Sequence, residues 1–356
     1  MSSNISEQQT QNSFDTTYTR LVNKRLFCLL IAIFALFALL VTDILVGPAF
    51  LNAFDVLSAL VSPQSQADPT VYVIVHSIRL PMTLMALVVG ASLGIAGVQM
   101  QTILGNPLAS PYTLGFSAAA GFGAAVTILI GFELPFIPGF TVPLAAFIMA
   151  GLACGLVYGF AHVRGVTAEI MILAGIATLF LFQSLQSLVQ YMASPEVLQE
   201  IVFWLFGSML KASWFSVSVS SSILILSMVI LARNSWQLTA LRMGDERARS
   251  IGVNVQRLRI KIFLLVSLLT AGAVAFVGTI GFIGLVAPHI ARMIVGEDHR
   301  ILMPLSGLVG GLLMIGASIV SKIISPGYVV PIGIVTAVIG VPFLFGLILT
   351  HKKSHW

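Results

Sequence analysis

The stretch LTALRMGDERARSIGVNVQRLRIK, residues 238–261, is the most highly charged part of a chain that otherwise avoids charge. It holds eight charged side chains, whereas the whole chain of 356 residues has only 18 Lys and Arg and 13 Asp and Glu, and 58% of its residues are hydrophobic. This composition, with apolar runs of about twenty residues, is typical of a polytopic all-α membrane protein. The charged stretch is therefore predicted to be a loop in water, and it orients the spans around it.

Ten membrane spans are predicted from apolar runs that end at polar residues, Pro or Gly. They lie near 26–46, 77–104, 108–130, 142–162, 167–191, 213–232, 261–280, 282–295, 303–323 and 332–350. The first run is too long for the apolar core of a signal peptide, so we interpret it as an uncleaved span. The predicted organisation is an N-terminal tail at 1–25, a transmembrane domain at 26–350 that contains the charged loop 233–260, and a C-terminal tail at 351–356.

The basic residues predict the orientation. With the N-terminus inside, 15 of the 18 Lys and Arg lie on the cytoplasmic side, and the three left outside are Arg79, Lys211 and Lys322. Cytoplasmic loops of membrane proteins carry such an excess, so both tails are predicted to be cytoplasmic. The same excess accounts for the net charge of +5, and nucleic-acid binding is not predicted.

Residues that begin and end helices predict a short helix at 246–251 inside the charged loop. Asp245 is a candidate N-cap, Glu246 suits the first turn, Arg249 suits the last turn, and Gly252 can adopt the left-handed conformation that ends a helix. The apolar side of this helix would consist of Ala248, Ile251, Val255 and Leu258. A rigid, capped helix suits contact with a soluble partner, whereas a loop that is only solvated would not need caps.

Two further segments are irregular. LGNPLASPYTLG (104–115) places Pro107 and Pro111 between the second and third spans, and a helix must break there because proline lacks an N–H and clashes with the preceding turn. A broken helix at membrane depth lines a water-filled path or is packed in protein, and the alternative is a plain cytoplasmic turn. SPEVLQEIVFWLFG (194–207) is predicted to be either an interfacial helix capped by Ser194 on the outer side or a simple loop.

The sequence also suggests a weak internal repeat. GASLGIAG (90–97) precedes Pro107 by ten residues, and AGAVAFVG (271–278) precedes Pro288 by ten residues. The two spans that contain these segments are predicted to run in opposite directions, which is the arrangement of inverted-repeat transporters.

The chain offers little that could catalyse a reaction. No Asp, Glu, Lys or Arg lies in the middle third of a predicted span, where ion-coupled carriers normally keep an ionisable group. His162, His289 and His299 lack metal-ligand spacing, and no P-loop, nucleophile elbow or H-E-x-x-H motif is present. We predict no catalytic site, no metal and no cofactor, so the energy for transport would have to enter through another protein.

Four motifs together resemble a known family. GNPLASPYTLGFSAAAGFGA (105–124), GDERARSIGVNVQRLR (244–259), GTIGFIGLVAPHIARMIVGEDHR (278–300) and PIGIVTAVIGVPFLFGLIL (331–349) are similar, in order and spacing, to the permease subunits of ATP-driven importers for ferric siderophores, haem and cobalamin. The resemblance implies an inner-membrane subunit of ten spans that pairs with a second, identical or homologous permease. It also implies two cytoplasmic ATPase subunits and a periplasmic or lipid-anchored substrate-binding protein as partners.

The resemblance further implies roles for individual residues. The segment that couples the permease to the ATPase would contain Gly244, Asp245, Glu246, Arg249, Ser250 and Gly252. The translocation path would contain Asn106, Pro107, Leu108 and Thr167. The binding protein would dock on Arg79 and Lys322, or on Lys211 instead because Met82 stands where many relatives carry a second arginine. The alternative is that Arg79 and Lys322 only extend to the lipid headgroups, as basic residues at span ends do.

The sequence therefore predicts the permease subunit of an ATP-binding-cassette importer for a ferric siderophore, not an enzyme. Cobalamin or haem is the alternative substrate. An ion-coupled secondary transporter is the alternative from another class, and it would need an ion site built from backbone carbonyls at 105–111. A membrane enzyme is disfavoured because no nucleophile and base are paired in the sequence.

Overall fold

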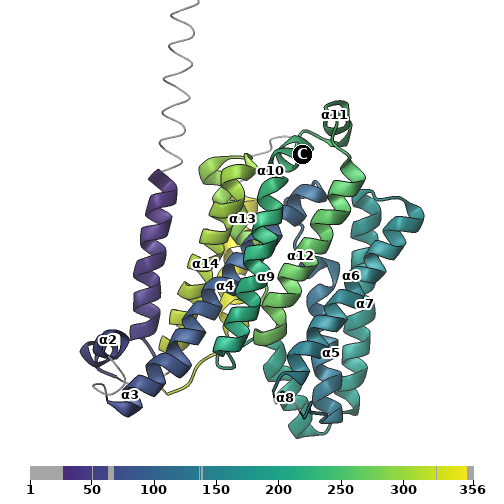
Figure 1. The fold of residues 1–356 in the computed structure, drawn as a ribbon. Coiled ribbons are helices and arrows are strands. Elements are labelled where there is room, and N and C mark those ends of the chain that lie inside the picture. Colours follow the sequence, from purple (N-terminus) through teal and green to yellow (C-terminus); the bar gives the residue numbers. More distant parts are fainter. Residues whose placement is uncertain are drawn as a thin grey trace, which may run out of the picture.

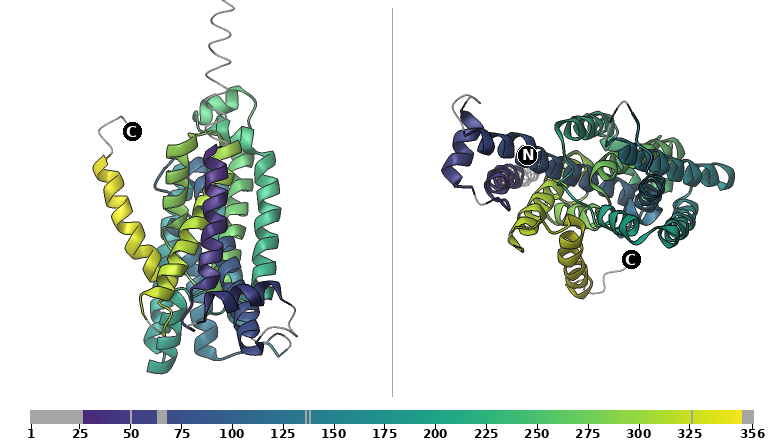
Figure 2. Two further views of the ribbon diagram at one scale, coloured as in Figure 1. Left: turned by 90° about the vertical axis from the view of Figure 1, so that its left-hand side faces the viewer. Right: turned by 90° about the horizontal axis from the view of Figure 1, so that it is seen from below.

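The computed structural model describes residues 27–350 except 50, 63–67, 136, 138 and 326, and both predicted tails lie outside the described residues. The secondary structure within the described ranges is entirely helical (Figures 1 and 2). The elements are the N-terminal helix Phe27–Leu45, α2 (Ala53–Val61), α3 (Pro69–Val73), η1 (Ile74–Arg79), α4 (Leu80–Ile103), η2 (Tyr112–Leu114), α5 (Phe116–Ile130), α6 (Thr141–Arg164), α7 (Ala168–Met192), α8 (Pro195–Leu205), α9 (Trp214–Arg233), α10 (Ser235–Leu241), α11 (Asp245–Ser250), α12 (Val255–Val277), α13 (Ile283–Val295), α14 (His299–Ile323) and α15 (Ile332–Thr350).

The predicted spans are all found as helices. In the part of the chain that the structure describes, seven helices are long and apolar enough to cross a membrane, and three shorter apolar helices occur in α5, α13 and α15. The second span begins at Pro69 rather than near 77, because Asp68 caps a helix that continues through α3 and η1 into α4. The third begins at Phe116 rather than near 108, since Pro107 and Pro111 exclude that segment from the helix.

The helix α4 is the centre of the bundle. In the continuous helix Pro69–Ile103, which includes α4, 83% of an apolar stretch of 18 residues is buried. The corresponding share is 11% in the N-terminal helix, which lies at the edge of the bundle (Figure 1). Glycines allow the neighbours of α4 to approach closely: a Cβ on Gly90 would lie 2.3 Å from the Gly310 carbonyl oxygen of α14, and one on Gly97 would lie 1.8 Å from the Gly284 carbonyl oxygen of α13. Small residues permit this kind of helix packing in lipid.

The short helices are divided between the two ends of the bundle. Helices α10 and α11 lie at one end, and α2, α3 and α8 lie at the other (Figure 1). The loop 233–260 and the segment 194–207 are therefore at opposite ends, and α8 starts after Ser194, whose hydroxyl accepts from the Val197 amide as predicted. Trp204 of α8 is only 6% exposed, because it packs beside Ile201 against the C-terminal part of α12.

Candidate functional site

The predicted loop helix is α11, and it lies between two glycines with positive φ. Gly244 (φ 102°) is its N-cap, and Gly252 (φ 90°) follows its end. A Cβ would meet no atom within 4 Å at either glycine, so the backbone conformation alone favours glycine there. The left-handed conformation predicted for Gly252 is confirmed, and its amide donates to the Arg249 carbonyl.

The capping role predicted for Asp245 is wrong. No side chain caps α11, and the Asp245 carboxylate faces Arg259 instead: Oδ1 accepts from Nη2 at 3.0 Å and Oδ2 from Nη1 at 3.2 Å. A bidentate pair with a guanidinium is stronger than a hydrogen bond with a backbone amide. The second cation near Asp245 is Arg249, at 3.9 Å and with 58% of its side chain exposed, so its contribution is small.

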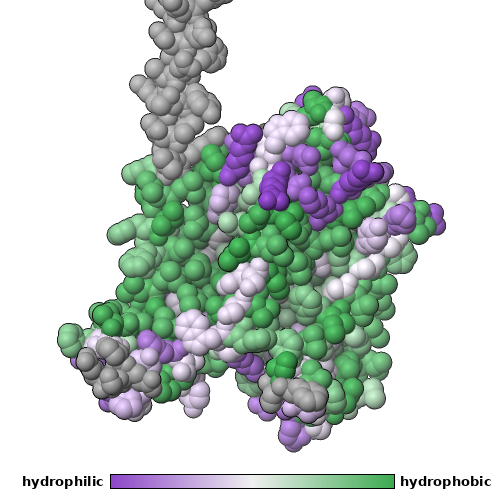
Figure 3. Space-filling view, in the orientation of Figure 1, coloured by the Kyte–Doolittle hydropathy of each residue, from purple (hydrophilic) through white to green (hydrophobic). Residues whose placement is uncertain are grey.

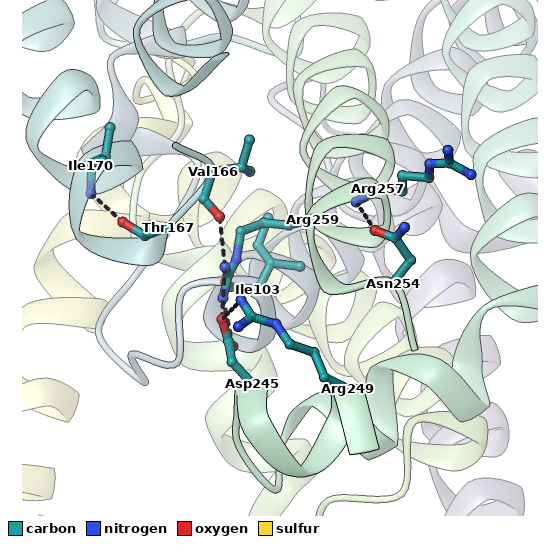
Figure 4. Close-up of polar contacts among 9 residues, drawn as sticks. All are labelled: Ile103, Val166, Thr167, Ile170, Asp245, Arg249, Asn254, Arg257 and Arg259. Carbon is teal, nitrogen blue, oxygen red and sulfur yellow. Dashed lines mark hydrogen bonds and ion pairs between the residues drawn. The ribbon is translucent and has the colours of Figure 1, made fainter. Parts of the chain in front are cut away.

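Arg259 joins four segments at the end of the bundle that carries α10 and α11 (Figure 4). Besides Asp245 of α11, its Nε donates to the Ile103 carbonyl at the end of α4 (2.7 Å), and its Nη1 donates to the Val166 carbonyl between α6 and α7 (3.0 Å). The side chain starts on α12 and is only 3% exposed. Because its donors are occupied on three sides, Arg259 fixes α11 relative to the membrane-embedded helices.

The four predicted path residues lie next to the carbonyls that Arg259 holds. Thr167 directly follows Val166 and caps α7, and its hydroxyl accepts from the Ile170 amide at 3.4 Å. On the other side, the chain turns after Ile103, where the Asn106 side chain accepts from the Leu108 amide at 2.9 Å and so closes the turn that contains Pro107. Leu108 is 51% exposed. Arg259 thus brings together two turns that are far apart in the sequence.

A second charged network lies beside α10. Glu297, in the loop between α13 and α14, accepts from Arg242 at 2.6 Å and lies 3.1 Å from Nε of Arg292. Arg292 also donates to Gln101 of α4 at 2.9 Å. Burial by itself would raise the pKa of Glu297, but the hydrogen bond from Arg242 and the charges of both arginines outweigh it, so this pKa lies below its usual value. The network ties the start of the loop to α4.

The outer surface of this region is hydrophilic, in contrast to the apolar sides of the bundle (Figure 3). The exposed residues of α11 include Glu246, Arg249 and Ser250. A cavity of about 400 Å³ opens beside them. It is lined by Trp236, Thr239, Ala240, Arg242, Met243, Ile251 and Glu297. Of the apolar side predicted for the loop helix, Ile251 is exposed, while Ala248, Val255 and Leu258 are buried.

Two of the three predicted docking cations are buried at the opposite end of the bundle. Lys322 of α14 lies 2.8 Å from the Asp43 carboxylate of the N-terminal helix, and the two side chains are 2% and 0% exposed. The Thr83 hydroxyl donates to the same carboxylate at 2.5 Å. Arg79 is 3% exposed and donates to the carbonyls of Ile44, Leu45 and Ala49.

The burial of Arg79 and Lys322 leaves them no free donor surface for a protein outside the bundle, so the prediction of direct docking on these two is corrected. Arg79 holds the end of the N-terminal helix and the loop after it through backbone carbonyls, and Lys322 supplies the counter-charge of Asp43. Lys211 is exposed and stays a predicted docking residue. As for metals, no group of three or more His, Cys, Asp or Glu that could hold an ion occurs in the described residues, and His299 is buried against Thr102.

Comparison of the sequence and the fold with known proteins finds similarity to transport proteins in each case. The model of the FecCD transport family matches residues 31–350. An ABC transporter permease protein of Methanocaldococcus jannaschii is 36% identical over 345 residues, which is 94% of this chain and 98% of that protein. The Fe(3+) dicitrate transport system permease protein of Escherichia coli is 36% identical over 81% of this chain and 88% of its own length. A metal-chelate type ABC transporter, solved in an inward-facing conformation, superimposes with a TM-score of 0.80 at 32% identity, over 91% of this chain and 99% of that one.

Proposed function

The chain belongs to the FecCD transport family, and from this membership we propose that it is the permease subunit of an ATP-driven importer that carries a ferric siderophore inward across the cytoplasmic membrane. In this proposal both termini are cytoplasmic, and the end of the bundle with α10 and α11 faces the cytoplasm. Two ATPase subunits, a second permease that is identical or homologous, and an outer substrate-binding protein complete the transporter. Hydrolysis of ATP takes place in the ATPase subunits.

The contact of Arg259 with both α11 and the two turns is the observation that supports this proposal most directly. A movement of α11 that is imposed by an ATPase would pull on Asp245, and the buried guanidinium would pass that displacement to the carbonyls of Ile103 and Val166. These carbonyls flank the predicted path residues Leu108 and Thr167. The exposed face of α11, with Glu246 and Ser250, is the surface that the ATPase would contact.

Reconstitution tests this function. The chain is purified with the ATPase, binding protein and any second permease encoded beside it and placed in vesicles with ATP on the ATPase side. Uptake of radio-iron ferrichrome should require ATP and stop with vanadate. Uptake of hemin or cyanocobalamin instead of ferrichrome would favour the alternative substrates. Uptake that follows an ion gradient when the ATPase is left out would contradict the proposal and favour a secondary transporter.

The proposed orientation has its own test. After Cys28 and Cys154 are replaced by serine, single cysteines at Ser235 and Ser194 should react with an impermeant thiol reagent from opposite sides of the membrane. Ser235 starts α10 and Ser194 caps α8, and these helices lie at opposite ends of the bundle (Figure 1). Ser235 should react only from the cytoplasmic side. Reaction of both from one side, or the reverse assignment, would contradict the orientation.

A further inference from the structure

A cavity of about 480 Å³ lies where two interruptions of the helices meet. One is the segment that ends with η2, and the other is the segment 278–282 between α12 and α13. The end of α8 and one face of α15 line the cavity on further sides, and the cavity is partly open. Its lining is Ser110, Tyr112, Thr113, Leu205, Phe206, Thr279, Gly281, Phe282, Leu285, Gly333, Ile334, Ala337 and Val338. None of these residues is among the path residues predicted from the sequence.

The cavity reaches from the middle of the bundle toward its outer end. At its inner limit, η2 packs against the middle of α7: a Cβ on Gly175 would lie 2.1 Å from a side-chain carbon of Leu114, and one on Gly115 would lie 2.7 Å from the Leu179 amide. At its outer limit, the Thr279 hydroxyl donates to the Leu205 carbonyl of α8, and the Ser208 amide donates to the Val277 carbonyl. The cavity therefore occupies a depth at which a transported molecule has left the outer surface.

The chemistry of the lining is uniform. It contains no Asp, Glu, Lys, Arg or His among its members. It combines carbon surface with hydroxyl groups, and Tyr112, with 43% of its surface exposed, interacts with the Thr279 side chain. An ion without a counter-charge is costly in such surroundings. A molecule that encloses its own charge and presents carbon and hydrogen-bonding oxygen to the outside would fit.

Phe282 forms the strained wall of this cavity. Its φ is 67° and its ψ is −35°, and it is the one non-glycine residue with positive φ in the described part of the chain. The neighbouring helix α15 approaches it closely because residue 340 is glycine, where a Cβ would lie only 2.6 Å from the Phe282 Cβ. Strained backbone of this kind persists where the surroundings hold it, and it is concentrated at ligand sites.

We propose that this cavity is a site in the translocation path where the substrate contacts the permease, with Phe282 and Tyr112 as its aromatic walls. The substrate that it binds is a metal chelate whose charge is enclosed by the organic ligand. The proposal rests on the permease function proposed above and adds the residues that touch the substrate. Its volume lies in the range of pockets for drug-sized ligands, about 300–1,000 Å³, so it holds a compact chelate or one side of a larger one. A free oxyanion would find no cation here.

Filling the cavity tests the proposal. Ala337→Trp adds an indole to a lining residue of α15, and Ile225→Trp adds the same group to α9, where Ile225 is 62% exposed and lines no part of the cavity. The reconstituted complex is assayed with radio-iron ferrichrome, hemin and molybdate. Ala337→Trp should lower chelate uptake at least about tenfold, whereas Ile225→Trp should stay within about twofold of wild type, and both should assemble with the ATPase.

A second measurement does not depend on how the tryptophan is accommodated. In the background without Cys28 and Cys154, a cysteine at position 337 should be labelled by a small thiol reagent, and ferrichrome delivered by the binding protein should slow this labelling. Wild-type chelate uptake by Ala337→Trp, or labelling that ferrichrome leaves unchanged, would overturn the proposal and leave the permease function intact. Uptake of molybdate in preference to both chelates would contradict the enclosed-charge argument. A wild-type complex that takes up neither these three probes nor cyanocobalamin would contradict the permease function itself, and this proposal with it.

Discussion

Replacement of Lys322 by methionine is expected to leave the Asp43 carboxylate buried without its counter-charge. The two groups are 2.8 Å apart, and their side chains are 2% and 0% exposed, so water cannot replace the ammonium. The Thr83 hydroxyl would still donate to the carboxylate, and the charge of Arg79 would still attract it, but the Nη donors of Arg79 are bound to backbone carbonyls. Removal of one partner of a buried ion pair typically costs about 3–5 kcal/mol of unfolding free energy, against about 0–1 kcal/mol for an exposed pair.

Unfolding of the purified chain in mixed micelles of increasing dodecyl sulfate content would measure this loss. Arg249→Met is the matched control, because it removes an exposed cation 3.9 Å from Asp245, and its cost should stay below about 1 kcal/mol. The double change Asp43→Asn with Lys322→Met keeps the volume and removes both charges. It should recover most of the stability, with a coupling energy of about 2 kcal/mol or more. A loss below about 1 kcal/mol for Lys322→Met, or a double variant that is worse than the single one, would refute the reasoning.

Three further changes test the two ends of the bundle. Gly252→Val forces a β-branched residue to φ 90° and should cost about 1 kcal/mol or more locally, so that the variant inserts but loses substrate-stimulated ATP hydrolysis in the complex; normal stimulation would remove the coupling role. Glu297→Gln should lower the thermal midpoint at pH 7. Because the folded pKa of Glu297 is depressed, its stabilising contribution is present above its unfolded pKa of about 4.3 and is lost as pH falls through the folded pKa. The gap between wild type and Glu297→Gln should therefore close below about pH 4, and a gap independent of pH would show that the charge is not involved. Lys211→Glu should slow association of the binding protein in a salt-sensitive way, and an unchanged on-rate at low ionic strength would exclude docking there.

Local patterns in the sequence were sufficient for the long apolar helices and α8, but α2, α3 and α10 were not predicted. Apolar runs predicted ten apolar helices, of which seven are long enough to cross a membrane, and the Ser-Pro pair at 194–195 predicted the start of α8. The errors in the spans are at their ends, where the helix boundary depends on one residue, such as Asp68, which extends the second span outward. The positive φ of Gly252 could be predicted because glycine directly after the end of a helix commonly adopts the left-handed conformation.

The side chains that were predicted wrongly are those whose hydrogen-bond or ion-pair partners are distant in the sequence. Asp245 has the local features of an N-cap, but Arg259, fourteen residues later, recruits its carboxylate. Arg259 itself looked like one more cytoplasmic charge, although its position between Leu258 and Ile262, both buried, was a signal that it faces the bundle. Arg79 and Lys322 were predicted to be exposed docking residues because each lies at the end of an apolar run, but both are buried. The sequence gives no indication that they turn inward, because their acceptors belong to the N-terminal helix and the loop that follows it.

The ion pair between Asp43 and Lys322 also sets an order for the biosynthesis of the protein. The two residues are 279 positions apart, and at about 5–20 residues per second the ribosome needs roughly 14–56 s to make the interval between them. During that time the Asp43 carboxylate of the first span has no Lys322 ammonium to pair with, and few side chains of this span are covered by other helices even in the final structure. The ion pair of the helix that is made first is thus completed only after the ninth span has entered the membrane, whereas Arg79 of the second span can bind the end of that helix much earlier.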